Sequence, residues 1–146
     1  TSLVMDCNNK LWTVTDGGYE GSPYGHEVPS LYRIDAEKFI IEKRFEFKFG
    51  DAPSEVQLNG TRDKLYWINN DIWEMDVDAN NIPVRPFLPH DGTIYYGLTI
   101  CPRTGDVYIA DAIDYVQQGM VYRYSKDGKF IDGFYAGIIP GSFCWK

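Results

Sequence analysis

Short runs in which β-branched and aromatic residues alternate with polar ones recur along the whole chain. The clearest are Lys10 to Thr15, Leu31 to Asp35, Lys64 to Asn69, Ile72 to Asp76, Asp106 to Asp111 and Val121 to Ser125. Such alternation is typical of strands, and turn-forming pairs such as Asn8-Asn9 and Asn59-Gly60 separate the runs. The segment Asp35 to Phe45 comes closest to a helical spacing, but it alternates better as a strand. The pattern predicts an all-β chain with almost no helix.

The predicted strands form a repeat of four. Leu11 to Val14 matches Leu65 to Ile68 and Val107 to Ala110, and each is preceded by a polar turn. A short strand precedes each of these runs and two more follow it, including Ile40 to Phe45, Val84 to Leu88 and Phe130 to Tyr135. A period of roughly 40 to 55 residues is that of propeller blades. We therefore expect a β-propeller fragment of about three four-stranded antiparallel blades, residues 1–47, 53–89 and 95–136, with one extra strand at 141–146.

This alignment also predicts which aromatic side chains fill the space between neighbouring blades. The candidates share central positions in the second and third strands of each unit: Trp12, Tyr66 or Trp67, Trp73, Tyr108 and Tyr122. A fully buried tryptophan in such a place is worth about 3 to 5 kcal/mol of stability relative to alanine.

Composition narrows the classes of partner. The chain has 146 residues, 44% of them hydrophobic, which is enough to bury the core of one domain. Its net charge is -7, and no dense run of lysine or arginine is present to follow a phosphate backbone, so nucleic acid is not an expected partner. No apolar run approaches the roughly 20 residues of a transmembrane helix. No cofactor is expected.

The cysteines, Cys7, Cys101 and Cys144, show no metal-ligand spacing. We expect them to be reduced and buried, because each lies in or beside an apolar run. The carboxylates Asp71, Asp111 and Asp114 are hard oxygen ligands suited to calcium, but their spacing is not that of an EF-hand. Turn capping through nearby backbone N–H groups is the favoured role for these aspartates, and no metal site is predicted.

A family resemblance rests on the C-terminal third. The stretches "TGDVYIADAIDYVQQGMVYRYSKDGKFIDGF" and "AGIIPGSFCWK" resemble the last blades of YncE-like propeller proteins of the Bacteroidetes. The resemblance implies about seven blades in the complete family fold and a location at the cell surface or in the periplasm. Three blades and one extra strand leave apolar blade faces and an unpaired edge, so we expect self-association or a second chain that carries the remaining blades. Some similar surface propellers, the BtuG-type lipoproteins, capture cobalamin for an outer-membrane transporter, which implies a corrinoid as one candidate ligand.

Blade connectivity predicts one loop-rich face. Successive strands reverse direction, so the second-to-third connections and the blade-to-blade connections should lie on the same side. In chain order these six segments are Asp16 to Ser30, Phe47 to Pro53, Asn69 to Asp71, Pro89 to Tyr96, Asp111 to Gly119 and Ala136 to Gly141. We call them together the loop face. Length variation on one side of a constant scaffold is typical of binding loops.

The loop face supplies the candidate ligand-binding residues, which are aromatic, amide or acidic side chains: Tyr19, Tyr24, His26, Asn69, Asn70, His90, Asp91, Tyr95, Asp114, Tyr115 and Gln117. The aromatic rings suit a planar or sugar-like small molecule or glycan, and the polar groups suit hydrogen bonding. The alternative is that the aromatics only pack the loops against the scaffold. The chain's two histidines, His26 and His90, are its only neutral-pH bases and lie in no hydrolase motif, so no catalytic residue is predicted.

These features favour a non-enzymatic propeller module of the bacterial cell envelope that binds a ligand or protein at the loop face. A structural repeat domain that associates through its blade edges is the alternative from a different class. Corrinoid capture is the alternative that the family resemblance adds. Fold alone does not choose among them.

Overall fold

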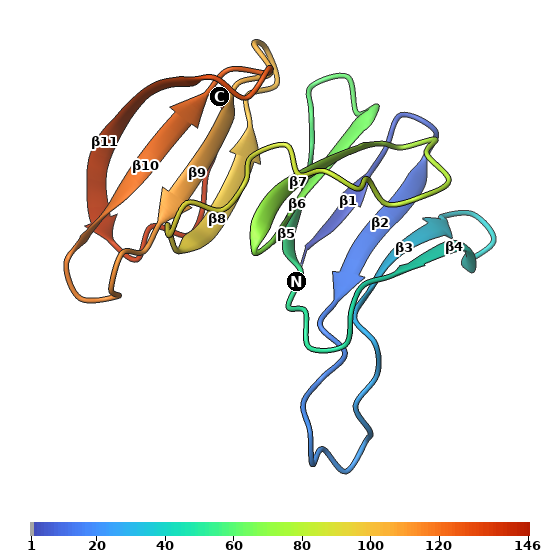
Figure 1. The fold of residues 1–146 in the computed structure, drawn as a ribbon. Coiled ribbons are helices and arrows are strands. Elements are labelled where there is room, and N and C mark those ends of the chain that lie inside the picture. Colours follow the sequence, from blue (N-terminus) through green and yellow to red (C-terminus); the bar gives the residue numbers. More distant parts are fainter. Residues whose placement is uncertain (1) are drawn as a thin grey trace.

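The computed structural model describes residues 2–146, which contain eleven strands and no helix. The first sheet comprises β1 (Leu3–Met5), β2 (Lys10–Thr15), β3 (Ser30–Asp35) and β4 (Ile40–Glu46). The second comprises β5 (Ser54–Leu58), β6 (Lys64–Asn69) and β7 (Asp71–Asp76). The third comprises β8 (Tyr95–Ile100), β9 (Val107–Asp111), β10 (Gln118–Tyr124) and β11 (Phe130–Ile138). Every strand pair is antiparallel, and the sheets stand side by side as a partial β-propeller (Figure 1). The predicted fold class is confirmed.

The middle sheet is buried on both faces, and strand β6 shows why its sequence is almost continuously apolar. Leu65 and Trp67 point toward the first sheet and join a cluster that includes Trp12. Tyr66 and Ile68, on the other face of the same strand, join a second cluster with the third sheet. Successive residues of a strand face opposite sides, so a strand between two blades needs apolar residues at every position. The run "KLYWIN" is this central strand.

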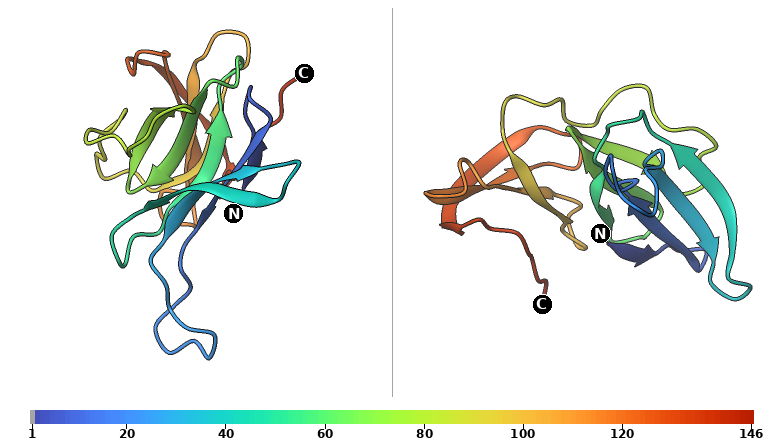
Figure 2. Two further views of the ribbon diagram at one scale, coloured as in Figure 1. Left: turned by 90° about the vertical axis from the view of Figure 1, so that its right-hand side faces the viewer. Right: turned by 90° about the horizontal axis from the view of Figure 1, so that it is seen from below.

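The short strand that the repeat predicts at the start of each unit is present, and it is the innermost strand of its sheet. Leu3–Met5, Ser54–Leu58 and Tyr95–Ile100 are β1, β5 and β8, and β5 packs against both of the others. Viewed from below, the sheets fan out from this inner side (Figure 2). The inner strands therefore line the side of the molecule on which a propeller has its axis.

The predicted fourth strand of the middle sheet is wrong in part. Residues 84–88 make only an isolated bridge between Leu88 and Ile72, so that sheet has three strands. Prolines at 83, 86 and 89 interrupt this stretch. Proline has no N–H to donate to a ladder and has a fixed φ, so pairing beyond the bridge is prevented.

The extra strand predicted at 141–146 is also absent as a strand. Residues 141–146 have no ladder partner, although the tail runs beside β8 as an inner strand of a further blade would. Gly141 approaches Gly97, and Trp145 Nε1 donates to Thr99 Oγ1 over 3.0 Å. A side-chain anchor replaces the backbone pairing that was expected.

Burial of the predicted inter-blade aromatics is confirmed for Trp12, Trp67 and Tyr66. Trp73, Tyr108 and Tyr122 are only half buried. Trp73 packs against the edge of the first cluster, where it stacks on Trp67, and Tyr108 faces Trp145 on the other side of the third sheet. Trp73, Tyr108 and Tyr122 therefore remain partly exposed to solvent.

The expectation of buried cysteines holds for Cys101 and is wrong for Cys7 and Cys144, which are exposed. Cys7 lies in the β1–β2 turn and Cys144 in the unpaired tail, so neither is enclosed between two sheets. Within residues 2–146 no helix is long and apolar enough to cross a membrane.

The segments of the loop face lie on one side of the sheets, at the bottom of Figure 1. Phe47 N–H donates to Pro29 O over 2.9 Å, which joins the β2–β3 loop to the connection that follows β4. Asn69 Nδ2 then donates to Asp51 Oδ2 over 3.1 Å. Contacts of this kind continue from blade to blade.

Between the middle sheet and the third sheet, the His90 N–H in the connection to β8 donates to Asp71 Oδ1 at the start of β7 over 2.6 Å. Ala112 N–H donates to Ile94 O over 3.3 Å. The loop face is thus one continuous surface rather than a set of separate hairpin tips.

Candidate functional site

Two β-bulges lie at the loop-face ends of the neighbouring inner strands β5 and β8. In β5 the pairing with β6 slips between Ser54 and Gln57, and Glu55 within the slip has a left-handed φ of 55°. In β8 the pairing with β9 slips between Tyr95 and Gly97, which leaves Tyr96 as the extra residue. A bulge turns a side chain out of the regular pleat and is common beside binding sites. A left-handed φ at a glutamate costs about 1 to 3 kcal/mol, and residues strained in this way are common at binding sites.

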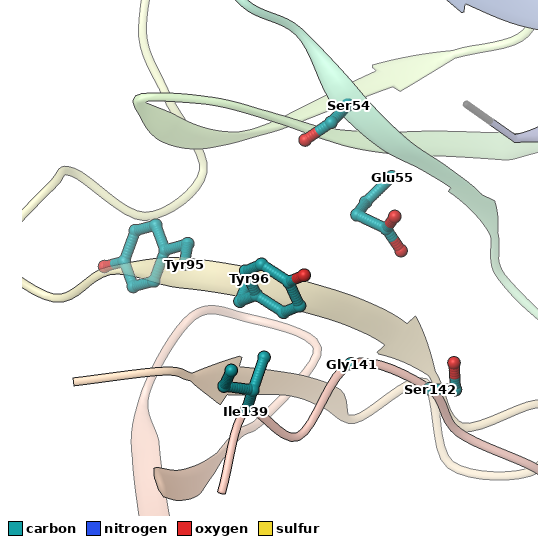
Figure 3. A pocket seen from close by; sticks show the side chains of 7 residues that line it. All are labelled: Ser54, Glu55, Tyr95, Tyr96, Ile139, Gly141 and Ser142. Carbon is teal, nitrogen blue, oxygen red and sulfur yellow. The ribbon is translucent and has the colours of Figure 1, made fainter. Parts of the chain in front are cut away.

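Both bulges open onto the same pocket, which we call the inner-strand cleft. Its volume is about 680 Å³, and its lining residues come from β5, β8 and the segment after β11: Ser54, Glu55, Tyr95, Tyr96, Ile139, Gly141 and Ser142. Figure 3 shows the Glu55 carboxylate and the Tyr96 side chain directed into the space between β5 and β8. A volume of this size suits a small molecule.

Glu55 is the charged group of the cleft. Burial raises the pKa of its carboxyl, while the positive charge of the chain's N-terminus and, to a smaller extent, the Leu98 backbone N–H act in the opposite direction. Desolvation penalises the charged form, and a hydrogen bond to the carboxylate favours it. None of the ion pairs among the described residues includes Glu55.

Tyr96 forms the aromatic wall of the cleft. Its ring meets the edge of the Tyr115 ring at a centroid distance of 5.9 Å and an interplanar angle of 81°. Gly141 lies against the same ring, so closely that a Cβ there would stand 3.0 Å from Tyr96 Cε1. Tyr115 and Gly141 therefore both contact the Tyr96 ring and hold it in place. Tyr115 has a left-handed φ of 64°.

Tyr95 lies at the margin of the cleft, and its hydroxyl points away from Glu55 (Figure 3). Burial raises the pKa of Tyr95, and the nearby carboxylates of Asp91, Asp71 and Asp111 raise it further. His90 meets this ring edge-on at 5.9 Å. The sequence-predicted residues His90, Asp91 and Tyr95 are thus brought together beside the cleft rather than inside it.

A second pocket, of about 620 Å³, lies on the loop face between the first and second sheets. It contains the predicted residues Asn69 and Asn70 together with Asp51, Asp71 and Trp73. Asn69 and Asp51 already bond to each other, and the Asn69 carbonyl accepts from Trp73 Nε1 over 3.1 Å. These polar groups are largely satisfied within the protein.

The β2–β3 loop places its predicted residues apart from both pockets. Tyr24 is 97% exposed and Tyr19 is 67% exposed, so neither packs the loop against the scaffold. His26 contacts Phe49 at a centroid distance of 4.4 Å. This loop extends well beyond the sheets in Figure 1.

The aspartates of the third blade act as turn caps. Asp114 Oδ1 accepts from the N–H groups of Val116 and Gln117 at 2.9 Å, and the Gln117 side chain bonds the other carboxylate oxygen. Asp91 Oδ1 accepts similarly from Thr93 N–H over 3.0 Å. No group of three or more metal-ligating side chains occurs in residues 2–146.

Sequence reasoning missed Ser54, Glu55 and Tyr96. Glu55 sits in the run "SEVQL", where alternation gives no sign that one residue is extra. The left-handed φ expected of glycine or asparagine falls here on glutamate, so no turn residue marks the bulge. The only available signal is the adjacent pair Tyr95-Tyr96, which breaks the alternation at the start of β8.

No protein-family model matches this sequence, and neither does any curated protein. Solved structures do match. A quinoprotein alcohol dehydrogenase-like protein from Bacteroides thetaiotaomicron is similar with a TM-score of 0.70 and 16% identity over 92% of this chain. Hydrazine synthase of Kuenenia stuttgartiensis is similar with a TM-score of 0.67 and 13% identity over 94% of the chain. A gluconolactonase from Xanthomonas campestris gives 0.62 and 14% over 96%.

These similarities establish the fold. The chain is a β-propeller segment. It spans 33%, 36% and 47% of the three matched chains, respectively. At these identities the activities of the matched proteins say nothing direct about this one.

Proposed function

We propose that this chain is part of a non-enzymatic β-propeller of the bacterial cell envelope that binds a small ligand in the inner-strand cleft on its loop face. The observation that carries the proposal is the pair of bulges that turn Glu55 and Tyr96 into one pocket. Two adjacent strands each depart from regular pairing at the same level. Such departures weaken a sheet and are retained where a side chain must be re-aimed.

The cleft has the chemistry of a binding site and lacks that of a catalytic one. It offers one carboxyl, an aromatic wall and two serine hydroxyls, from Ser54 and Ser142. A nucleophile and a base within hydrogen-bonding reach of each other would be needed for covalent catalysis, and the lining residues include no histidine, lysine or cysteine. Binding is therefore the function that this set of groups supports best.

The envelope location rests on the resemblance to YncE-like proteins of the Bacteroidetes. The resemblance to BtuG-type lipoproteins supports a corrinoid as an alternative ligand. Cyanocobalamin is therefore one of the compounds to be titrated.

The test is a two-dimensional NMR titration of this chain with a fragment library of neutral, anionic and cationic polar compounds, together with cyanocobalamin. We expect at least one compound to shift the amide signals of Ser54, Glu55, Tyr96 and Gly141. The same compound should lose most of its effect in Tyr96→Ala. Tyr135→Ala, which removes an exposed tyrosine from β11, is the matched control and should bind normally.

The proposal is overturned if no compound shifts these signals, or if Tyr96→Ala and Tyr135→Ala bind equally well. A spectrum of each variant without ligand shows whether its fold is intact. Shifts centred on Asn69 and Asn70 would place binding in the second pocket and would also contradict the proposal.

A scaffold function is the second candidate, and the exposed face of β11 favours it. Phe130, Ile131, Phe134, Tyr135 and Ile138 are between 43% and 72% exposed, far more apolar surface than one strand normally shows to water. Charged substitutions at Phe134 and Ile138 should then abolish any concentration-dependent self-association seen by sedimentation. Ligand titration at the inner-strand cleft should be unaffected by them.

A further inference from the structure

From the chemistry of the inner-strand cleft we infer that its ligand is an organic cation, a small molecule carrying an ammonium or guanidinium group. This inference rests on the proposed function and adds the ligand class to it. The lining of the cleft and the charge of the surrounding surface support it independently of each other.

Glu55 is half buried in the cleft. A carboxylate partly removed from water is destabilised unless a cation or several hydrogen-bond donors replace its solvation. The positive charge of the chain's N-terminus and the Leu98 backbone N–H both favour the charged form of Glu55, but burial outweighs them and its pKa stays raised. No lysine or arginine lines either the inner-strand cleft or the adjoining small pocket formed by Glu55, Gln57, Leu98 and the tail. A bound cation would supply the compensation that is still lacking.

Tyr96 gives the cleft an aromatic wall. The face of a tyrosine ring is electron-rich and attracts a cation placed within about 6 Å of its centroid. Glu55 and Tyr96 approach the same space from opposite strands (Figure 3). A carboxylate on one side and an aromatic ring on the other is the arrangement that favours ammonium groups over neutral groups of equal size.

This protein already uses the same chemistry on its outer strands. Arg44 lies over the Tyr32 ring at 5.8 Å, and Arg123 lies over the Tyr108 ring at 5.7 Å while it pairs with Asp106. In both places the cation comes from the chain itself. At Tyr96 the lining of the cleft supplies the acid and the ring without the cation.

The whole loop face is negatively charged. Its six segments carry eight acidic residues and a single basic one, Lys48; the acids are Asp16, Glu20, Glu27, Asp51, Asp71, Asp91, Asp111 and Asp114. Turn hydrogen bonds lower the pKa values of Asp91 and Asp114, so both stay ionised at neutral pH. The acidic and basic residues outside these segments are equal in number, so the loop-face segments account for the whole net charge of -7. A surface of one sign attracts ligands of the opposite sign and speeds their encounter.

Other ligand classes fit less well. An anion would be repelled both by Glu55 and by the loop face. A bare metal ion would find one carboxylate in the cleft where calcium needs six or more oxygen ligands. A neutral polyol could use the serine hydroxyls, but it would leave the burial of the Glu55 carboxyl only partly compensated.

The test compares choline with 3,3-dimethyl-1-butanol, its neutral isostere, by NMR titration of this chain at low salt. We expect choline to shift the Glu55, Tyr96 and Gly141 amides and to bind at least about fivefold more tightly than the isostere, since an ion contact of this kind is worth about 1 kcal/mol or more. Raising the NaCl concentration should weaken choline binding and leave the isostere unchanged.

Two variants separate the local contact from the general field. Glu55→Gln keeps the shape of the side chain and should remove the preference for choline. Glu27→Gln removes one exposed loop-face charge outside the lining of the cleft and should alter choline binding less than about twofold, as expected for a distant screened charge.

The outcomes distinguish the two proposals. Equal binding of choline and its isostere, or an undiminished preference in Glu55→Gln, overturns the cation inference while the inner-strand cleft remains a binding site. Binding of neither probe, while a neutral sugar or cyanocobalamin shifts the cleft amides, also overturns it. If no compound of any charge shifts them, the proposed function itself fails.

Discussion

Trp67 and Trp73 stack with their ring centroids 6.3 Å apart and their planes within 12° of parallel. They are direct cross-strand partners in β6 and β7, yet Trp67 is completely buried while Trp73 is half exposed at the border of the second pocket. The pair marks where the core between the first two sheets ends and the loop face begins.

This difference in burial predicts unequal costs of truncation. Trp67→Ala should destabilise the chain by about 3 to 5 kcal/mol, because it empties a fully enclosed volume. Trp73→Ala should cost roughly 1 to 3 kcal/mol, since only part of its apolar area is removed from water. Urea denaturation of both variants measures the difference. Equal costs would contradict the burial that the structure assigns to Trp73.

The side opposite the loop face contains a tight approach between two turns. A Cβ at Gly60 would lie 1.9 Å from the Pro102 carbonyl oxygen, so the turn before β6 and the turn before β9 touch through backbone. Gly60→Ala should therefore cost about 1 to 3 kcal/mol through overpacking. Gly137→Ala is the matched control, because a Cβ there meets nothing within 4 Å. A neutral Gly60→Ala in thermal unfolding would show that the turns separate without cost.

Asp106 makes stability depend on pH in a direction that can be derived. The Arg123 guanidinium, at 2.7 Å, holds the pKa of this carboxyl below its usual value. A carboxyl whose folded-state pKa is lowered stabilises the fold above its unfolded pKa, and this contribution is lost as the pH falls through the folded value. Asp106→Asn should thus be less stable than the parent at pH 7, and the gap should shrink below about pH 4.

The measurement is a series of urea midpoints for the two proteins across this acid range. Asp132→Asn is a suitable control, because the same arginine contacts Asp132 only at 3.8 Å and that carboxylate is more than half exposed. A constant gap at all pH values would mean that Asp106 stabilises the fold by its shape rather than by its charge.

Local sequence patterns encode some features of this fold and not others. The strands of all three sheets follow from alternation, because each blade buries at least one face. The failures come from effects that alternation cannot express. Prolines at 83, 86 and 89 block a ladder that an apolar run otherwise predicts, and residues 141–146 have inner-strand composition without a strand to pair with.

The shared side of the loops follows from hairpin connectivity, but the central residues of the inner-strand cleft do not follow from the sequence. Tyr95 and Tyr115 stand out in the sequence because they are aromatic residues in or beside loops. Glu55 and Tyr96 do not, because a bulge is defined by the register between two strands, and register depends on the partner as much as on the strand itself. Whether the predicted loop-face residues bind a ligand stays a prediction.

The contact between the second and third sheets on the loop face can be tested by hydrogen exchange. Asp71→Ala removes the acceptor of the His90 N–H and should speed exchange of that amide by about tenfold, which corresponds to the loss of one hydrogen bond to a charged group. Asp114→Ala is the control, and it should affect the Val116 and Gln117 amides instead. Unchanged His90 exchange would mean that the two loops are held together by other contacts.

The C-terminal tail provides the last prediction. Trp145 donates its indole N–H to Thr99 Oγ1, and its ring meets Tyr108 edge-on at 5.2 Å, so one side chain holds a segment that has no ladder of its own. Thr99→Val keeps the shape of the buried partner and removes the acceptor. The indole N–H signal of Trp145 should then move toward its solvent-exposed position and exchange faster, because the donor is returned to water. Ser142→Ala, in the same tail, should leave that signal in place. If Thr99→Val also leaves it in place, the ring contact alone fixes the tail, and the inner-strand cleft keeps its third wall without this hydrogen bond.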